Sequence, residues 1–161
     1  MPAVTAVEQL KTFLPTAKKA LILGCGLGSI IEIMKRNGCT PDFTLVEQDK
    51  VVLKWAMEFT DGMPGRKITP VCMDAKVFMQ QNTAKYDFIF IDIFNDLTVP
   101  PFVYSREFLE QCRNGLSAGG HIAFNYIPAN AQEKEQVQNV FTSVFPGQWV
   151  AKTDRNQVFF S

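Results

Sequence analysis

A glycine-rich turn and three carboxylates each follow a short apolar run of the sequence. The turn is Gly24-Cys25-Gly26-Leu27-Gly28, and Glu47, Asp74 and Asp92 end three later apolar runs. Glycine lets a ligand approach the main chain closely, and the N–H groups that begin a helix attract polar ligand atoms. A carboxylate can accept both hydroxyls of a ribose, or a hydrogen bond from an adenine amino group. These residues together predict a site for a ligand that contains a nucleoside.

Each residue of this set also has a purely structural interpretation. The glycines could form a tight turn without a ligand, Glu47 could be an exposed acid at a helix start, as Asp49 could equally be, and Asp74 could cap the next helix. Asp92 could orient an attacking amine or hydroxyl and take its proton, or it could fix the following loop or contact a cofactor. The ligand interpretation is favoured because all of them end successive strands, the edge where open α/β sheets bind ligands.

A dinucleotide is the first alternative ligand, because Glu47 stands about where a ribose-binding acid follows a dinucleotide fingerprint. The third glycine of a GxGxxG fingerprint, however, would fall at position 29, which is Ser29. The three glycines here have GxGxG spacing instead, which argues against a dinucleotide.

The elements that must position these residues alternate along the chain. Apolar runs predict strands at 20–23, 43–46, 68–73, 88–91, 121–126, 149–153 and 157–160, and helical periodicity predicts helices at 5–14, 30–37, 51–59, 77–79, 108–116 and 130–141. A turn is expected at Gly119-Gly120, and Asp154-Arg155-Asn156 is too short for a parallel crossover and suits a hairpin. The sequence therefore predicts one α/β domain over 1–161. Its sheet is expected to be Rossmann-like, seven-stranded and mostly parallel, with helices on both faces and an antiparallel C-terminal edge hairpin.

Composition narrows the partners and the setting. Sixteen basic residues balance sixteen acidic ones without a basic stripe, so nucleic acid is not an expected partner. The four cysteines lie far apart, which suggests neither a zinc site nor a disulfide framework, and we expect no metal. The first residues lack the pattern of a signal peptide, and no apolar run has membrane-spanning length. We therefore expect a cytoplasmic protein without a membrane partner.

The same residues resemble the class I S-adenosylmethionine-dependent methyltransferase superfamily, and within it the spermidine-synthase-like branch. The resemblance covers residues 18–127 and is carried by ALILGCGLGS, FTLVEQD, CMDA, KYDFIFIDIF and VPPFVYSREFLEQCRNGLSAGGHIAFN. It implies that the glycine turn holds the amino-acid part of the cofactor, that Glu47 holds the ribose, and that Asp74 lies beside the adenine. The residues expected to bind the cofactor are Gly24, Cys25, Gly26, Gly28, Glu47, Gln48, Asp74 and Ala75.

The sequence departs from the polyamine-forming members of this branch at two positions. Those members usually have an acid in the glycine turn where this chain has Leu27, and a second aspartate after the fourth strand where it has Asn95, although Asp96 is adjacent. They also have an N-terminal β-rich segment over the polyamine site, for which the roughly twenty residues before the first predicted strand are too few. The resemblance therefore implies a transferase that uses S-adenosylmethionine, and we expect methyl transfer to a small-molecule acceptor with Asp92 as the catalytic residue.

Two other functions stay open, because a fold does not fix a reaction. One is aminopropyl transfer from decarboxylated S-adenosylmethionine, and the other is a non-catalytic module that senses a nucleotide or binds a partner. Pro100-Pro101-Phe102 is expected to form a stiff loop at the active site, whereas His121, the single histidine, is expected to be structural. The sequence names neither the acceptor nor the oligomeric state, and it is compatible with a homodimer.

Overall fold

The computed structural model describes residues 11, 13–26, 28–61, 67–96, 98–152 and 156–161. The helix expected at 5–14 lies almost entirely outside these residues, and the 3₁₀ turn η1 (Leu14–Thr16) is described at its end. None of the described helices combines the length and the apolar character that a membrane span requires.

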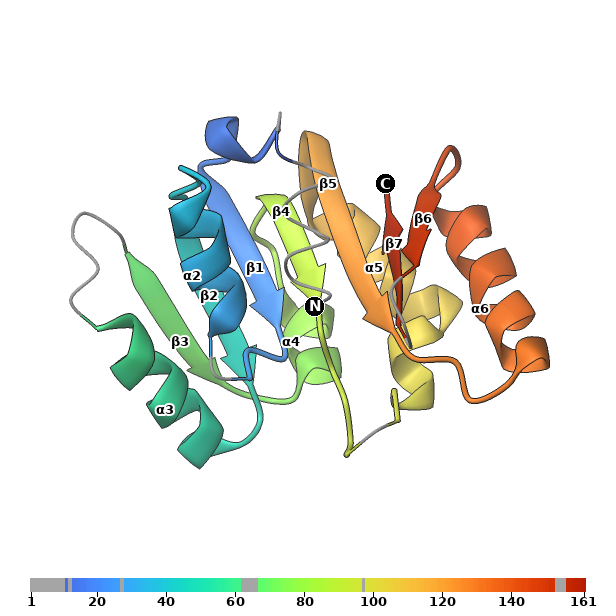
Figure 1. Ribbon diagram of the computed structural model, residues 1–161, viewed down its shortest axis with the longest axis horizontal. Coiled ribbons are helices and arrows are strands. Elements are labelled where there is room, and N and C mark those ends of the chain that lie inside the picture. The colour runs from blue at the N-terminus through green and yellow to red at the C-terminus, as the bar shows by residue number, and fades with distance from the viewer. Residues whose placement is uncertain (1–10, 12, 27, 62–66, 97, 153–155) are drawn as a thin grey trace.

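Strands and helices alternate along the chain as the apolar pattern predicts (Figure 1). The strands are β1 (Lys19–Leu23), β2 (Asp42–Glu47), β3 (Ile68–Cys72), β4 (Tyr86–Ile91), β5 (Leu116–Tyr126), β6 (Trp149–Lys152) and β7 (Gln157–Phe160). The helices are α2 (Ser29–Arg36), α3 (Lys50–Thr60), α4 (Ala75–Gln81), α5 (Arg106–Gly115) and α6 (Ala131–Val144), and a second 3₁₀ turn is η2 (Pro101–Tyr104). All seven predicted strands are confirmed.

The strands form one sheet in the order β3-β2-β1-β4-β5-β7-β6. Strands β1 to β5 pair in parallel, and β7 pairs antiparallel with both β5 and β6. The predicted C-terminal hairpin therefore forms one edge of a mostly parallel sheet. Because β7 lies between β5 and β6, the reversed strand is the inner strand of the hairpin.

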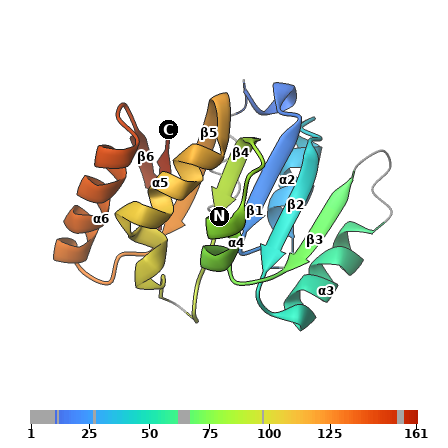
Figure 2. The ribbon, with the colours of Figure 1, turned by 180° about the vertical axis from the view of Figure 1, so that it is seen from behind.

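Helices cover both faces of the sheet, which explains why its central strands are apolar on both sides. Helices α2 and α3 lie on one face and α4, α5 and α6 on the other (Figures 1 and 2). In β4, Phe88 and Phe90 pack on the side of α2, whereas Ile89 and Ile91 pack on the side of α5. A strand enclosed in this way must bury both sets of side chains. The short helices and the sheet thus share two apolar cores.

The turn predicted at Gly119-Gly120 is wrong, because both residues lie inside β5. Tyr86 of β4 pairs with Leu116, whereas Phe88 pairs with His121, so β5 carries extra residues between these pairs. They form an irregularity in which Gly119 has φ 72°. A bulge uses the left-handed conformation of glycine within a strand, and sequence alone does not separate this use from a turn.

The register of the parallel strands brings four residues at their carboxyl ends into one row. In sheet order these residues are Glu47, Gly24, Asp92 and Asn125, each in or one step beyond a paired position. The backbone ladder continues into the row, because Gly24 N donates to Val46 O and Asp92 N donates to Leu23 O, both at 2.9 Å. The first three are residues that the sequence already links to chemistry, so this edge positions the site.

Gly24 allows β1 and β4 to approach each other at this row. It has φ 79°, and a Cβ on it would lie 2.4 Å from the main-chain oxygen of Asp92. We expect Gly24→Ala to lower the free energy of unfolding by at least about 2 kcal/mol, because backbone must move to relieve the contact. Denaturant unfolding measures the change.

Gly38→Ala is the matched control for this substitution. Gly38 has φ 76°, and a Cβ added to it would meet nothing within 4 Å. Gly38→Ala should therefore lower the free energy of unfolding by about 1–2 kcal/mol, which is the strain of a non-glycine residue in the left-handed conformation alone. Equal losses in the two variants would mean that the contact with Asp92 is unimportant.

Candidate active site

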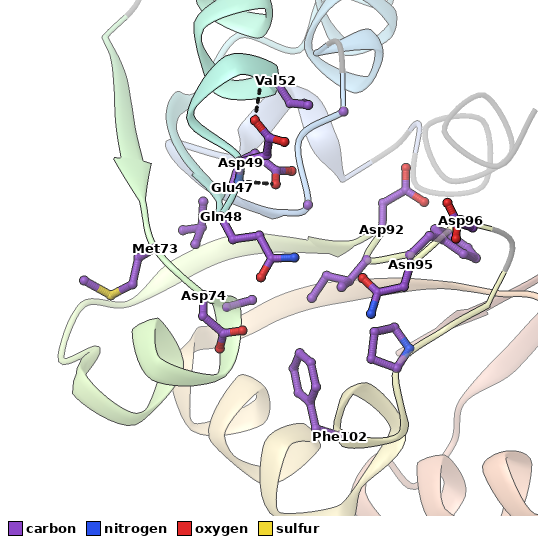
Figure 3. Close-up of a pocket in the computed structure, with 17 residues that line it drawn as sticks. Glu47, Gln48, Asp49, Val52, Met73, Asp74, Asp92, Asn95, Asp96 and Phe102 are labelled. Atoms are coloured by element: carbon purple, nitrogen blue, oxygen red, sulfur yellow. Dashed lines mark hydrogen bonds between the residues drawn. The ribbon is translucent and has the colours of Figure 1, made fainter.

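A cavity of about 920 Å³ lies at the carboxyl ends of the central strands. Its walls come from the segments that follow β1, β2, β3 and β4 and from the loop that leads to η2. Figure 3 shows Glu47, Gln48 and Asp74 on one side of the cavity, and Asn95 and Asp96 on the other. This is the edge at which the sequence analysis expected a ligand.

Most of the residues predicted to bind a cofactor line this cavity. They are Gly24, Gly26, Glu47, Gln48, Asp74 and Ala75, and Asp92 lines it as well. Pro100 and Phe102 also line it, so the proline loop is confirmed as part of this wall. Their proximity to one another is thus established, and their role in binding stays a prediction.

Cys25 and Gly28 are not among the residues that line the cavity, and both instead shape the turn. Gly28 N donates to Cys25 O at 2.8 Å, and Gly28 begins α2 with φ 78°. A Cβ on Gly28 would lie 3.2 Å from the Thr60 side chain of α3, so this glycine serves helix packing. Burial raises the pKa of the Cys25 thiol to about 12, which keeps it protonated and unreactive.

Glu47 and Asp49 divide two tasks that the sequence left open. Asp49 caps α3, because its Oδ1 accepts from Val51 N at 2.7 Å and from Val52 N at 3.2 Å. Glu47 accepts one hydrogen bond from Asp49 N at 2.9 Å through Oε1. No described residue donates to Glu47 Oε2, so this carboxylate can still accept a hydrogen bond from a ligand in the cavity.

Asp74 caps a helix and also lies where it can contact a ligand, so both interpretations of this residue apply. Its Oδ1 accepts from Lys76 N at 2.8 Å and from Val77 N at 3.1 Å, so it caps α4. The same residue lines the cavity, and within the described part of the chain its Oδ2 receives no hydrogen bond. A cap and a ligand contact can therefore use different oxygens of one carboxylate.

Asp92 is held by a residue that the sequence analysis missed. Asn125 Nδ2 donates to Asp92 Oδ1 at 2.6 Å, and Asn125 is only 3% exposed. Burial raises the pKa of the Asp92 carboxyl above its ordinary value, and the N–H of Asn125 lowers it in part. An amide at the end of an otherwise apolar run was the available signal, but its meaning depends on the register between β4 and β5.

The cavity is acidic. Five carboxylates line it, those of Glu47, Asp49, Asp74, Asp92 and Asp96. None of the described residues in its wall is a lysine, an arginine or a histidine. Carboxylates attract cations and repel a diphosphate. Across the described residues, no three His, Cys, Asp or Glu side chains are grouped to hold a metal ion.

His121 lies away from this chemistry, as expected. Its Nδ1 is 2.9 Å from the main-chain oxygen of Ser161, and its ring meets the edge of Phe13 with the ring centres 4.2 Å apart. These contacts connect β5 to the two ends of the described chain, which is a structural role.

Over residues 7–147, the sequence matches a family described as the spermine/spermidine synthase domain. The chain belongs to this family. This match confirms the predicted resemblance to the spermidine-synthase-like branch. It also covers more residues at each end than the predicted range 18–127. Within the spermine/spermidine synthase domain, the matched region contains the whole cavity wall, from Gly24 to Phe102.

Two curated relatives carry different activities in their names. An N-terminal histidine N-methyltransferase of Emericella nidulans is 33% identical over 112 residues, which are 66% of this chain and 19% of the relative. A polyamine aminopropyltransferase of Vibrio vulnificus is 30% identical over 116 residues, 70% of this chain and 39% of the relative. The chain thus matches well under half of either protein's length.

A solved structure supports the fold assignment. Human methyltransferase-like protein 13 in complex with SAH superposes with a TM-score of 0.80 at 20% identity, over 98% of this chain and 78% of that one. The likeness confirms that this spermine/spermidine synthase domain has the Rossmann-like methyltransferase fold.

The burial of Asp92 has a consequence for stability. Because its pKa is raised in the folded domain, folding disfavours the ionised form, and the free energy of unfolding should fall as pH rises from the ordinary pKa of 3.8 through the raised value. Asp92→Asn removes the charge and can still accept from Asn125. We expect it to raise the melting temperature above that interval, by about 2–4 °C for each kcal/mol gained.

Differential scanning calorimetry across a pH series checks this expectation. The advantage of Asp92→Asn should disappear at acid pH, where the carboxyl of the unchanged chain is already neutral. Glu58→Gln on the exposed side of α3 is the control, since Glu58 only faces Lys54 at 3.7 Å at the surface. A pH-independent difference between Asp92→Asn and the unchanged chain would contradict the assignment of a raised pKa.

Proposed function

We propose that this domain binds S-adenosylmethionine, or its decarboxylated form, and transfers a carbon substituent from the sulfonium to an amine of a small-molecule acceptor. The acidic cavity is the observation that carries the proposal. A sulfonium and an ammonium are both cations, and five carboxylates without a described basic partner suit them.

The residues of the row fit the parts of such a donor. Gly26 has φ 47°, and nothing lies within 4 Å of a Cβ built on it, so the turn leaves open space for the amino-acid part. Glu47 has a carboxylate oxygen available for the ribose hydroxyls, and Asp74 stands one strand further along for the adenine amino group. The match between row and ligand supports the proposal.

The donor supplies an activated carbon: as the acceptor nitrogen forms its bond to that carbon, the carbon–sulfur bond breaks and its electrons stay on sulfur. Asp92 then has two tasks. Its carboxylate can orient the attacking nitrogen and can take the proton that the nitrogen must lose. A carboxylate with a raised pKa is a stronger base than an exposed one, which suits this role.

Methyl transfer is the first form of this proposal. S-adenosylmethionine has a carboxylate that its decarboxylated form lacks, and an acid in the glycine turn would repel it. Leu27, whose placement lies outside the described residues, is uncharged, so by its identity it removes that repulsion. The methyltransferase name of the Emericella relative is consistent with this form.

Aminopropyl transfer is the second candidate, and two observations favour it. The Vibrio relative is named a polyamine aminopropyltransferase. In addition, Asp96 lines the same cavity as Asp92, so a second carboxylate is present although Asn95 occupies the expected position. A diamine acceptor needs one nitrogen deprotonated and the other held as an ammonium, which two acids could do.

Binding of S-adenosylhomocysteine tests the donor site. We expect Glu47→Ala to weaken it by about 1–3 kcal/mol, the usual effect of losing a charge-assisted hydrogen bond. Titration calorimetry measures the affinity, and Glu58→Ala is the control because it removes the same carboxylate from the exposed side of α3. Unchanged affinity in Glu47→Ala would remove Glu47 from the site.

Product analysis with two donors tests the reaction. The protein is incubated with a panel of amines that includes putrescine, once with S-adenosylmethionine and once with the decarboxylated form, and products are identified by mass spectrometry. We expect methylated amine from the first donor, little spermidine from the second, and loss of turnover in Asp92→Asn. Robust spermidine formation that Asp92→Asn abolishes would establish the aminopropyl reaction instead. Tight S-adenosylhomocysteine binding without turnover of either donor would favour a sensing module.

A further inference from the structure

Asn125 is a polar side chain where the apolar pattern of β5 predicts none. It is 3% exposed, and its neighbours Ala123 and Phe124 belong to the two apolar cores. A buried amide must satisfy its hydrogen bonds within the protein, because unpaired polar groups in a core cost about 1–3 kcal/mol. Its partners therefore indicate what it is for.

The two ends of this amide have different partners. Nδ2 donates to Asp92 Oδ1 at 2.6 Å, and Oδ1 accepts from Asn156 Nδ2 at 2.8 Å. The reverse orientation would set the amide oxygen against the Asp92 carboxylate, two acceptors with no proton between them. The carboxylate of Asp92 thus sets the direction in which Asn125 presents its N–H, and Asn156, directly before β7, satisfies the oxygen at the other end of the amide.

The register places this contact beside the reacting groups. Ile91 pairs with Phe124, so Asp92 and Asn125 follow at the same level on neighbouring strands. Phe90 and Ala123 lie two residues before Asp92 and Asn125, respectively, and both pack in the core beneath α2. Because residues two apart in a strand point to the same face, Asp92 and Asn125 also project to the face that α2 covers. The hydrogen bond occupies Oδ1 of Asp92, and no described residue donates to its Oδ2. Asp92 is also one of the residues that line the cavity.

We propose that Asn125 is a positioning residue for Asp92: it fixes one carboxylate oxygen so that the other meets the acceptor, and it keeps the carboxylate ionised to receive a proton. This inference rests on the proposed function, in which Asp92 is the base.

The surroundings of Asp92 make such a donor necessary. The titratable groups that share its cavity are Glu47 and Asp49 from the segment that ends β2, Asp74 from the segment that follows β3, and Asp96 from its own loop, and all are acids. Cys25 of the neighbouring turn is a protonated thiol. Burial favours the neutral form of Asp92, and the N–H of Asn125 is the described contact that opposes it.

The test follows the ionisation of Asp92 directly, by carbon-13 NMR of its side-chain carboxyl over a pH series. Asp92→Asn assigns the signal. In Asn125→Leu, an apolar substitution of similar size, the midpoint of the Asp92 titration should move to higher pH, because the N–H that stabilises the ionised carboxylate is lost. Asn125→Asp retains the size of the side chain and places a second carboxyl beside Asp92; the two then titrate as a pair, whose higher midpoint should lie above the Asp92 midpoint of the unchanged chain.

Gln157→Leu is the matched control. Gln157 is another buried amide, 6% exposed, on the strand next to β5, and it has no contact with Asp92 among the described hydrogen bonds. Its loss should change the melting temperature without moving the Asp92 midpoint. For the transfer reaction, kcat/KM of Asn125→Leu at the unchanged chain's midpoint should fall about tenfold and recover at higher pH.

The midpoint and the activity separate the two hypotheses. An unmoved midpoint in folded Asn125→Leu, or in Asn125→Asp if the first variant does not fold, would overturn the positioning role. A moved midpoint in a protein that transfers no group from either donor would support the contact and reject the proposed reaction. A fall in kcat/KM that does not recover at high pH would also overturn the ionisation part of the inference.

Discussion

The contact between the main chains of Gly24 and Asp92 is the constraint on which this site depends. Two parallel strands can carry a shared binding edge only if their ends lie at the same level and close together. The hydrogen bond from Asp92 N to Leu23 O sets the level, and the missing side chain of Gly24 permits the approach. The same register then places Glu47 on one side of this pair and Asn125 on the other.

The acids at this edge show how one chemical group can serve the fold and the ligand together. Asp49 and Asp74 each cap a helix that is separated from the preceding strand by only two residues. Because short strand-to-helix connections bring helix starts to the carboxyl edge, capping acids and ligand-binding acids collect at the same place. A capping carboxylate uses one oxygen for N–H groups, which leaves the other for the cavity.

The burial of one carboxylate in this cavity opposes the stability of the domain. Burial disfavours the ionised form of Asp92, and the hydrogen bond from Asn125 offsets only part of that effect. A cationic ligand beside Asp92 would relieve it, so binding and folding would be coupled. An apolar residue in place of Asp92 would not have this unfavourable effect on stability. A destabilising group of this kind is usual at sites where function and stability compete.

The sequence by itself determined the strands, their parallel alternation with helices, and the residues that end them. This was possible because apolar periodicity and glycine turns are local signals, and a parallel sheet brings its strand ends to one edge whatever the details. The predicted turn at Gly119-Gly120 failed because a glycine in the left-handed conformation serves a turn and a bulge equally well.

The tertiary structure decided which of those residues meet. Cys25 and Gly28 sit in the predicted turn, yet the turn directs them toward the protein and leaves Gly24 and Gly26 on the cavity. The pairing of Asp92 with Asn125 depends on the register of β4 with β5, and a bulge of glycines in β5 shifts that register. Since register is a property of two strands distant in sequence, no local pattern of residues could have specified it.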